Sequence, residues 1–273
     1  MVATPIGNLA DITLRALEVL RTVDAIFAED TRVTRALLAH HGIDAKARSL
    51  HAHNEDRAAQ EVMAALEAGR DVALVSDAGT PGISDPGARA VQSALAAGKE
   101  VIPIPGASAL AAALSISGTQ GPFAFLGFLP SKGAARRRAL ERWREFPHTL
   151  VLYEAPHRIL DCLVDLTESL GKDRDVVIAR ELTKMFESVH ACRLADAHDW
   201  LAEDANRQRG EFVLIVSGAP APDEDDSEAR RVLEALLDEL PVKTAVKLAA
   251  TITGAPRNAL YAAALDLEKA RQR

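Results

Sequence analysis

Along the first hundred residues, short apolar runs alternate with longer segments in which apolar residues recur at helical spacing. The runs predict strands at 24–28, 72–76 and 101–104, and the longer segments predict helices at 31–41, 55–67 and 86–98. Asp85 followed by Pro86 has the residue types of a helix N-cap and first helical position, and Gly98 ends that helix. Such alternation predicts a mostly parallel sheet with helices on its faces.

The same alternation restarts after Pro105 and Gly106. Ser108 can cap a short alanine-rich helix that ends at Gly118. Further strands are predicted at 123–128, 149–153, 176–180 and 212–216, with helices at 134–144 and 157–170. We therefore expect an α/β fold of two lobes, at 1–106 and 107–221, with a join too short to be a flexible tether.

The last fifty residues have a different pattern. An acidic run at 222–228 is typical of a linker, and helices are predicted at 228–240, 242–251 and 258–269. The turn at 253–256 contains a glycine, so the final two helices have the pattern of a helix-turn-helix. Because purely structural helical hairpins share this pattern, it leaves nucleic-acid binding by residues 222–273 open.

Composition narrows the class of protein. With 48% hydrophobic and 26% charged residues, the chain has the composition of an ordinary globular protein, which excludes disordered and collagen-like proteins. No apolar stretch approaches the roughly 18–20 residues of a membrane helix, and the N-terminus lacks the pattern of a secretory leader. Cys162 and Cys192 are too few for a disulfide framework or a multi-cysteine zinc site, so a cytoplasmic protein without a bound metal is expected.

Charge is segregated along the chain. The net charge of −7 argues against a protein that coats nucleic acid without selectivity. Residues 131–144 nevertheless carry a local charge of +5, whereas residues 222–240 carry −6. This segregation fits either a face that binds a polyanion or a solvated helix face beside an acidic linker.

Three glycine-containing loops follow predicted strands, at 4–9, 76–87 and 105–109. Ligands of open α/β sheets bind outside the carboxyl ends of the strands, so the three loops can surround one pocket. Gly79 and Gly82 allow a close backbone approach, and Asp77 could accept hydrogen bonds from a ligand. The loops contain neither a dinucleotide fingerprint nor a phosphate-binding loop.

Five segments together carry a family resemblance. They are Thr4-Pro-Ile-Gly-Asn-Leu-Ala-Asp-Ile-Thr13, Ala28-Glu-Asp-Thr-Arg32, Ser76-Asp-Ala-Gly-Thr-Pro-Gly-Ile-Ser-Asp-Pro-Gly87, Ile104-Pro-Gly-Ala-Ser108 and Tyr153-Glu-Ala-Pro-His-Arg158. In these segments the chain resembles the tetrapyrrole-methylase-like (class III) S-adenosylmethionine methyltransferases, specifically the branch that methylates RNA of the small ribosomal subunit. The resemblance covers nearly the whole chain, including the helical tail.

The resemblance implies a fold, a reaction and a cofactor. The family has two α/β lobes with S-adenosylmethionine in the cleft between them, usually in a homodimer. Members of this branch methylate the ribose 2′-oxygen of a cytidine in the decoding region of 16S ribosomal RNA, conventionally numbered 1402. By motif position, the resemblance assigns cofactor contacts to Ile6, Asp77, Thr80, Ser108, Ala109 and Tyr153.

The reaction requires a base and a means of holding RNA. A neutral ribose hydroxyl is a poor nucleophile, so a side chain should take its proton. The sequence offers Glu29, Asp30, Glu154, Glu181 and Lys184, and our hypothesis is that Glu154 or Glu181 assists. Cations predicted to contact RNA phosphates are Arg32, Lys132, Arg136, Arg137, Arg138 and Arg158.

Two other classes of function stay open at this point. One is a small-molecule methyltransferase with a tetrapyrrole-like substrate, which the 76–87 loop, the basic 132–144 stretch and the helical tail disfavour. The other is a non-catalytic protein that binds RNA or the ribosome and has kept the fold. The second alternative predicts no cofactor binding, which a thermal-shift assay with S-adenosylmethionine would detect.

Overall fold

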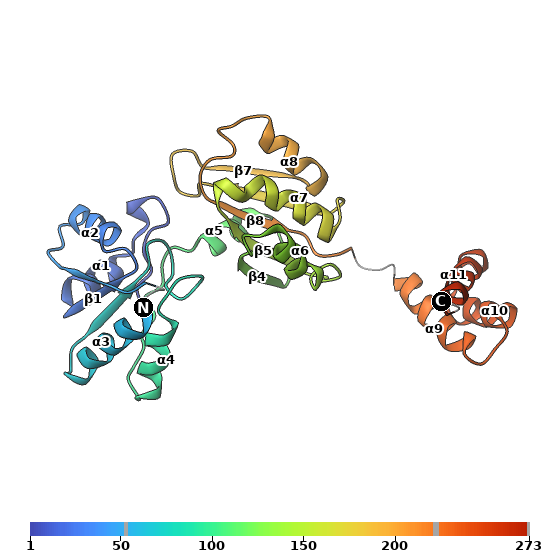
Figure 1. The fold of residues 1–273 in the computed structure, drawn as a ribbon, viewed down its shortest axis with the longest axis horizontal. Coiled ribbons are helices and arrows are strands. Elements are labelled where there is room, and N and C mark those ends of the chain that lie inside the picture. The colour runs from blue at the N-terminus through green and yellow to red at the C-terminus, as the bar shows by residue number, and fades with distance from the viewer. Residues whose placement is uncertain (52–53, 221–223, 272–273) are drawn as a thin grey trace. The chain divides into compact units, whose positions relative to one another are not determined.

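A computed structural model describes residues 1–51, 54–220 and 224–271, which form two compact units, Met1–Ala219 and Pro220–Arg273 (Figure 1). Within the larger unit the chain forms two lobes, each built on its own sheet. In the part of the chain that the structure describes, no helix is long and apolar enough to cross a membrane.

The N-terminal lobe is built on a parallel sheet of three strands in the order β2-β1-β3. The strands are β1 (Ala25–Ala28), β2 (Ala47–Ser49) and β3 (Val72–Val75), and the helices are η1 (Leu9–Asp11), α1 (Leu14–Thr22), α2 (Thr31–His40), α3 (Glu55–Glu67) and α4 (Ala88–Ala96). One core cluster joins the sheet to α1 and α2, and another joins it to α3 and α4. Both faces are therefore covered, as a parallel sheet requires.

The strand predicted at 101–104 is reduced to one bridge. Ile104 and β3 each form a parallel bridge to Val2, so the first residues of the chain lie between them. The prediction was wrong in extent because Ile104 alone of this run is buried, and an apolar run does not show how many hydrogen bonds its backbone makes.

Helix α4 begins later than the sequence predicted. Its N-cap is Gly87, with φ of 123°, and Asp85 lies outside the helix. The carboxylate of Glu55, from α3, accepts hydrogen bonds from the N–H groups of Gly87 and Arg89 at 3.0 and 3.2 Å. Because a distant side chain satisfies the first N–H groups of α4, Asp85 is not needed as a cap and the prediction was wrong.

The C-terminal lobe contains a mixed sheet of five strands in the order β4-β5-β8-β6-β7. The strands are β4 (Phe123–Phe128), β5 (Thr149–Glu154), β6 (Asp175–Arg180), β7 (Ser188–Arg193) and β8 (Phe212–Val216). Only β4 and β5 are parallel, so the expectation of a mostly parallel sheet holds for the N-terminal lobe alone. Strand β7 was missed because it is an edge strand whose residues alternate between exposed and half-buried.

Helices cover the two faces of this sheet unequally (Figure 1). Helices α6 (Gly133–Glu141), α7 (Ile159–Leu170) and α8 (Leu194–Ala202) pack on one face around a large apolar core. Helix α5 (Ala109–Ile116) packs on the other face, and Ile6 of the N-terminal lobe joins its core cluster. A short turn of 3₁₀ helix, η2 (Pro156–Arg158), links β5 to α7.

The smaller unit contains α9 (Glu224–Leu237), α10 (Val242–Thr253) and α11 (Arg257–Arg271) around one apolar core. Gly254, with φ of 76°, ends α10 in the left-handed conformation that permits a tight turn into α11. Helix α9 begins at Glu224, so the predicted linker at 222–228 is helical over most of its length, while its first two residues lie outside the described part of the chain.

Candidate functional site

A cavity of about 380 Å³ lies in the larger unit, where loops at the carboxyl ends of the strands meet. All six residues that the family resemblance assigns to the cofactor line it, namely Ile6, Asp77, Thr80, Ser108, Ala109 and Tyr153. The three glycine-containing loops predicted to surround one pocket each contribute to its wall. Its volume lies within the roughly 300–1,000 Å³ typical of small-molecule sites.

Three of these side chains also tie the loops together. The carboxylate of Asp77 accepts a hydrogen bond from the N–H of Asp30 at 2.7 Å, which joins the loop after β3 to the loop after β1. The hydroxyl of Thr80 donates to the carbonyl of Ala107 at 3.1 Å. From the C-terminal lobe, the hydroxyl of Tyr153 accepts from the N–H of Leu110 at 3.0 Å. These hydrogen bonds therefore join the loops of the cavity wall to one another, and the start of α5 to β5.

Three carboxylates gather on one side of the cavity. Asp85 lines it together with Glu29 and Asp77. Burial, followed by the charges of Glu29 and Asp77, raises the pKa of Asp85 to about 6. Burial and the charges of Asp77 and Asp30 also raise the pKa of Glu29. Within the described residues, no arginine or lysine forms an ion pair with these three acids, so the cavity favours a cationic ligand.

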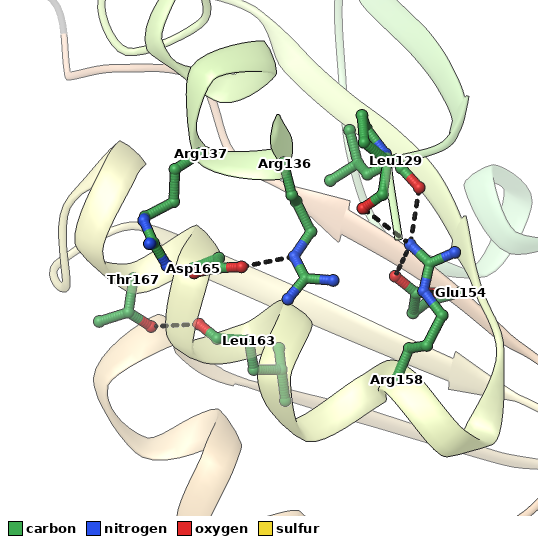
Figure 2. A network of polar contacts seen from close by, with 9 residues as sticks. Leu129, Arg136, Arg137, Glu154, Arg158, Leu163, Asp165 and Thr167 are labelled. Carbon is green, nitrogen blue, oxygen red and sulfur yellow. Dashed lines mark hydrogen bonds and ion pairs between the residues drawn. The ribbon is translucent and has the colours of Figure 1, made fainter. Parts of the chain in front are cut away.

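Glu154, one of the two predicted catalytic residues, is committed to an internal network (Figure 2). Its side chain is 0% exposed, and its carboxylate lies 3.1 Å from the Nε of Arg158. The N–H of Ala155 donates to the same carboxylate at 2.8 Å. A buried carboxylate that is paired and hydrogen-bonded in this way holds structure and is a poor candidate for proton removal.

Glu181, the other predicted catalytic residue, is also ion-paired. Its carboxylate accepts from the Nζ of Lys184 at 2.8 Å and from the N–H of Glu211 at 2.9 Å. Burial acts to raise the pKa of Glu181, but these hydrogen bonds and the charge of Lys184 lower it overall. Lys184 lines the cavity, whereas Glu181 supports it from behind.

The cations predicted to contact RNA differ in how exposed they are. Lys132 and Arg138 are exposed, as is Arg32, which pairs with Asp30 at 2.6 Å. Arg136 is different, because its side chain is 4% exposed and its Nε lies 2.6 Å from the Asp165 carboxylate in Figure 2. The buried guanidinium of Arg136 does not suit the RNA contact predicted for it.

Arg137 and Arg158 are intermediate cases. Arg137 is half-exposed and shares Asp165 with the buried arginine at 2.5 Å. Arg158 is 18% exposed and donates to the carbonyl of Leu129 at 2.6 Å as well as pairing with Glu154 (Figure 2). Arg158 is thus engaged inside the protein, which does not suit the phosphate contact predicted for it.

Comparison with known proteins adds a decisive observation. Residues 1–198 match the family model described as Tetrapyrrole (Corrin/Porphyrin) Methylases, and residues 223–268 match the RsmI C-terminal HTH domain. The chain belongs to the tetrapyrrole methylase family.

Curated relatives locate the chain within that family. The ribosomal RNA small subunit methyltransferase I of Xylella fastidiosa is 54% identical over 263 residues, covering 96% of each chain. The enzyme of the same name from Pseudomonas aeruginosa is 51% identical over 270 residues, covering 97% of this chain and 96% of its own. The solved structure of diphthine synthase shares the fold, with a TM-score of 0.60 at 18% identity over 80% of this chain and 88% of its own.

Sequence analysis did not assign the observed place in the cavity wall to several residues of this tetrapyrrole methylase, among them Asp85, Lys184 and Phe128. Asp85 was interpreted as a helix cap, Lys184 was left as one of several possible bases, and Phe128 was not singled out. Asp85 lies in the loop already favoured for ligand contact, so its position after the strand was a usable signal. For Phe128 no such signal existed, because an aromatic residue that ends a strand is usually part of the core.

Proposed function

We propose that this chain transfers a methyl group from S-adenosylmethionine to the ribose 2′-oxygen of a cytidine in the decoding region of 16S ribosomal RNA. The observation that carries the proposal is the near-full-length identity of about 50% to enzymes named ribosomal RNA small subunit methyltransferase I. Such identity extends over the larger unit and the helical unit alike, which supports a shared substrate as well as a shared fold.

The cavity fits the cofactor expected of this family. S-adenosylmethionine carries a sulfonium and an ammonium group and supplies an electrophilic methyl group when bound. Three carboxylates that form no ion pair with an arginine or lysine among the described residues suit those positive charges. Gly79, with φ of 84°, lines the cavity beside Ile6, and a Cβ added to it would be in ordinary van der Waals contact with that side chain. Thr80, Ser108 and Ala109 would hold the polar groups of the cofactor from the facing loops.

Asp85 is the residue we assign to proton removal from the ribose hydroxyl. A general base works best when its pKa lies near the working pH, and the pKa of Asp85 is raised to about 6. Its carboxylate lines the same cavity as Tyr153 and lies close enough for its charge to raise the pKa of that phenol. Glu154 and Glu181 lack this combination because each is held by a cation.

Exposed cations and the helical unit supply the RNA contacts in this proposal. Lys132 is the N-cap of α6 and Arg138 lies in its last turn, and both are exposed, so phosphates can reach them. Residues 222–273 would add contacts to the RNA or the subunit, and residues 1–106 and 107–221 would form the two walls of the cofactor cleft. The family resemblance also supports a homodimer that works in the cytoplasm, which light scattering and cell fractionation would test.

The test uses purified protein, radiolabelled S-adenosylmethionine and small ribosomal subunits from cells that lack the activity. The product is mapped by primer extension under conditions that stop at ribose 2′-O-methyl groups. A single methylated cytidine in the decoding region supports the proposal. Label in a base, in another region or in no RNA at all contradicts it, and in the last case a tetrapyrrole substrate becomes the next candidate.

A further inference from the structure

Strand β4 ends in an irregularity that turns its last aromatic side chain. Its register with β5 shifts between Phe125 and Gly127. In a regular strand, Phe125 and Phe128 would point to opposite faces because successive side chains alternate. Here both rings contact the ring of Tyr153, with centroids 4.9 and 5.6 Å away. The bulge therefore places Phe128 on the cavity side of the sheet, as bulges beside active sites often do.

The ring of Phe128 is exposed although it lines the cavity. Phe128 is 55% exposed, whereas Tyr153 beside it is half-buried and Ile6 and Leu182 are buried. A single exposed apolar residue is ordinary on a protein surface. The exposure of the Phe128 ring has a more specific explanation, which is that a bulge turns the ring toward a cavity where it can contact a ligand.

Close packing fixes the backbone on both sides of Phe128. Gly127 has φ of 62°, and a Cβ at that position would lie 3.0 Å from the hydroxyl of Ser84, next to Asp85 in sequence. After the ring, Arg158 donates to the carbonyls of Leu129 and Pro130 at 2.6 and 3.3 Å (Figure 2). The ring is therefore presented by a rigid framework close to the acidic side of the cavity.

We propose that Phe128 is the surface on which the base of the target nucleotide stacks when that nucleotide leaves the RNA stack. The inference rests on the proposed function. Bringing one ribose hydroxyl into a cavity is easier when its nucleotide leaves the RNA stack, and the unstacked base then recovers energy by stacking on an aromatic ring. With the base on Phe128, the ribose lies toward the loop that contains Ser84 and Asp85.

The stacking role predicts how much RNA affinity is lost when the ring of Phe128 is removed. Loss of one aromatic platform weakens single-stranded binding by about 10-fold to 100-fold. Since every base has a flat face, Phe128 contributes affinity and positioning rather than the choice of cytosine. Phe128→Leu should therefore raise the KM for small subunits by about that factor, while leaving the affinity for S-adenosylmethionine within about twofold.

The matched control is Phe123→Leu. Phe123 is 46% exposed on the same strand but does not line the cavity, so its replacement tests the general effect of losing an exposed ring from β4. Phe128→Trp retains a ring and should restore most of the RNA affinity. All four proteins, including the wild type, are compared by methylation kinetics on small subunits and by calorimetric titration with S-adenosylmethionine.

The outcomes separate this inference from the function on which it rests. If the wild type methylates subunits and Phe128→Leu behaves like Phe123→Leu, the stacking role is wrong and the proposed function stands. If Phe128→Leu loses cofactor affinity instead of RNA affinity, the ring belongs to the cofactor and the inference is again overturned. If the wild type leaves small subunits unmethylated, the proposed function and the stacking role fail together.

Discussion

Two groups of three carboxylates, one in each lobe, have opposite surroundings. In the C-terminal lobe, Glu154, Asp165 and Glu181 each lie within 3.1 Å of an arginine or lysine nitrogen. In the N-terminal lobe, Asp77, Asp85 and Glu29 line the cavity together, and the charges of Glu29 and Asp77 help to raise the pKa of Asp85. One set of acids is neutralised by the protein, and the other is left for a ligand to neutralise.

The ion-paired acids stabilise the fold, whereas the acids that line the cavity without such a partner lower its stability. Removing one partner of a buried ion pair leaves an uncompensated charge, which is strongly destabilising. Asp85 has the opposite effect on folding stability, because folding raises its pKa from an ordinary value of 3.8 to about 6. The folded state then holds its proton longer than the unfolded state, so stability falls as pH rises through this range. An ionisable side chain that lowers the stability of the folded state and also lines a cavity is a candidate functional residue.

The largest effect is expected at Asp85. Asp85→Asn keeps the shape of the side chain and removes its basic oxygen, so methyl transfer at saturating substrates should fall by about 100-fold to 10,000-fold. Thermal stability should not decrease, because the change removes a charge that folding disfavours. Asp44→Asn, at an exposed position of the same lobe, is the control. Full activity in Asp85→Asn would remove this residue from the mechanism.

Asp165 should show the reverse behaviour. Its side chain is 3% exposed and pairs with two arginines, so Asp165→Asn should lower the free energy of unfolding by about 3–5 kcal/mol. Activity per folded molecule should stay near that of the wild type, since Asp165 does not line the cavity. Denaturant titration measures the loss. Arg137→Ala, which removes the half-exposed partner, should cost much less than Arg136→Ala.

A smaller effect is expected where the two lobes touch at Gly7. A Cβ there would lie 2.4 Å from Cγ of Lys184 and 2.8 Å from the hydroxyl of Thr183, which accepts a hydrogen bond from the N–H of Asn8. Gly7→Ala should displace the cavity wall and lower kcat/KM by about 10-fold to 100-fold. Gly133→Ala, where the nearest atom is 3.4 Å away, is the control. Equal kinetics in the two variants would show that this contact does not position the site.

The smallest effects belong to the exposed cations. Lys132→Ala and Arg138→Ala should each weaken RNA binding by a few-fold and reduce the slope of log affinity against log salt by about 0.7–0.9. Lys46→Ala, at an exposed position in the N-terminal lobe, is the control. Filter binding at several salt concentrations measures the slope, and unchanged slopes in both variants would exclude α6 from the RNA interface.

Local patterns predicted most of the fold. Strands β4 and β8 and helix α3 have the bounds expected from their apolar residues. The gathering of three loops around one cavity was also predictable, because the carboxyl ends of parallel strands meet at one edge of a sheet. The edge strand β7 and the single bridge at Ile104 were beyond prediction, because pairing at an edge depends on neighbours that are distant in sequence.

The parts of the site that could not be predicted all depend on long-range contacts. Glu55 caps α4 across 32 residues and thereby leaves Asp85 for the cavity. Asp165, 29 residues from Arg136, draws that arginine into the core, although its position in a basic run suggested an exposed cation. Phe128 faces the cavity because of a one-residue bulge, and strand periodicity alone would have placed it on the opposite face.

The most direct test of the account is the single-turnover rate of methyl transfer to small subunits between pH 5 and 8, measured for the wild type and Asp85→Asn. The account predicts that the wild-type rate rises with pH at the acid end of this range and then levels off, because Asp85 must lose its proton before it can act as a base. The variant should be slow and lack this inflection. The same inflection in Asp85→Asn, at a similar rate, would show that the chemistry depends on a different group.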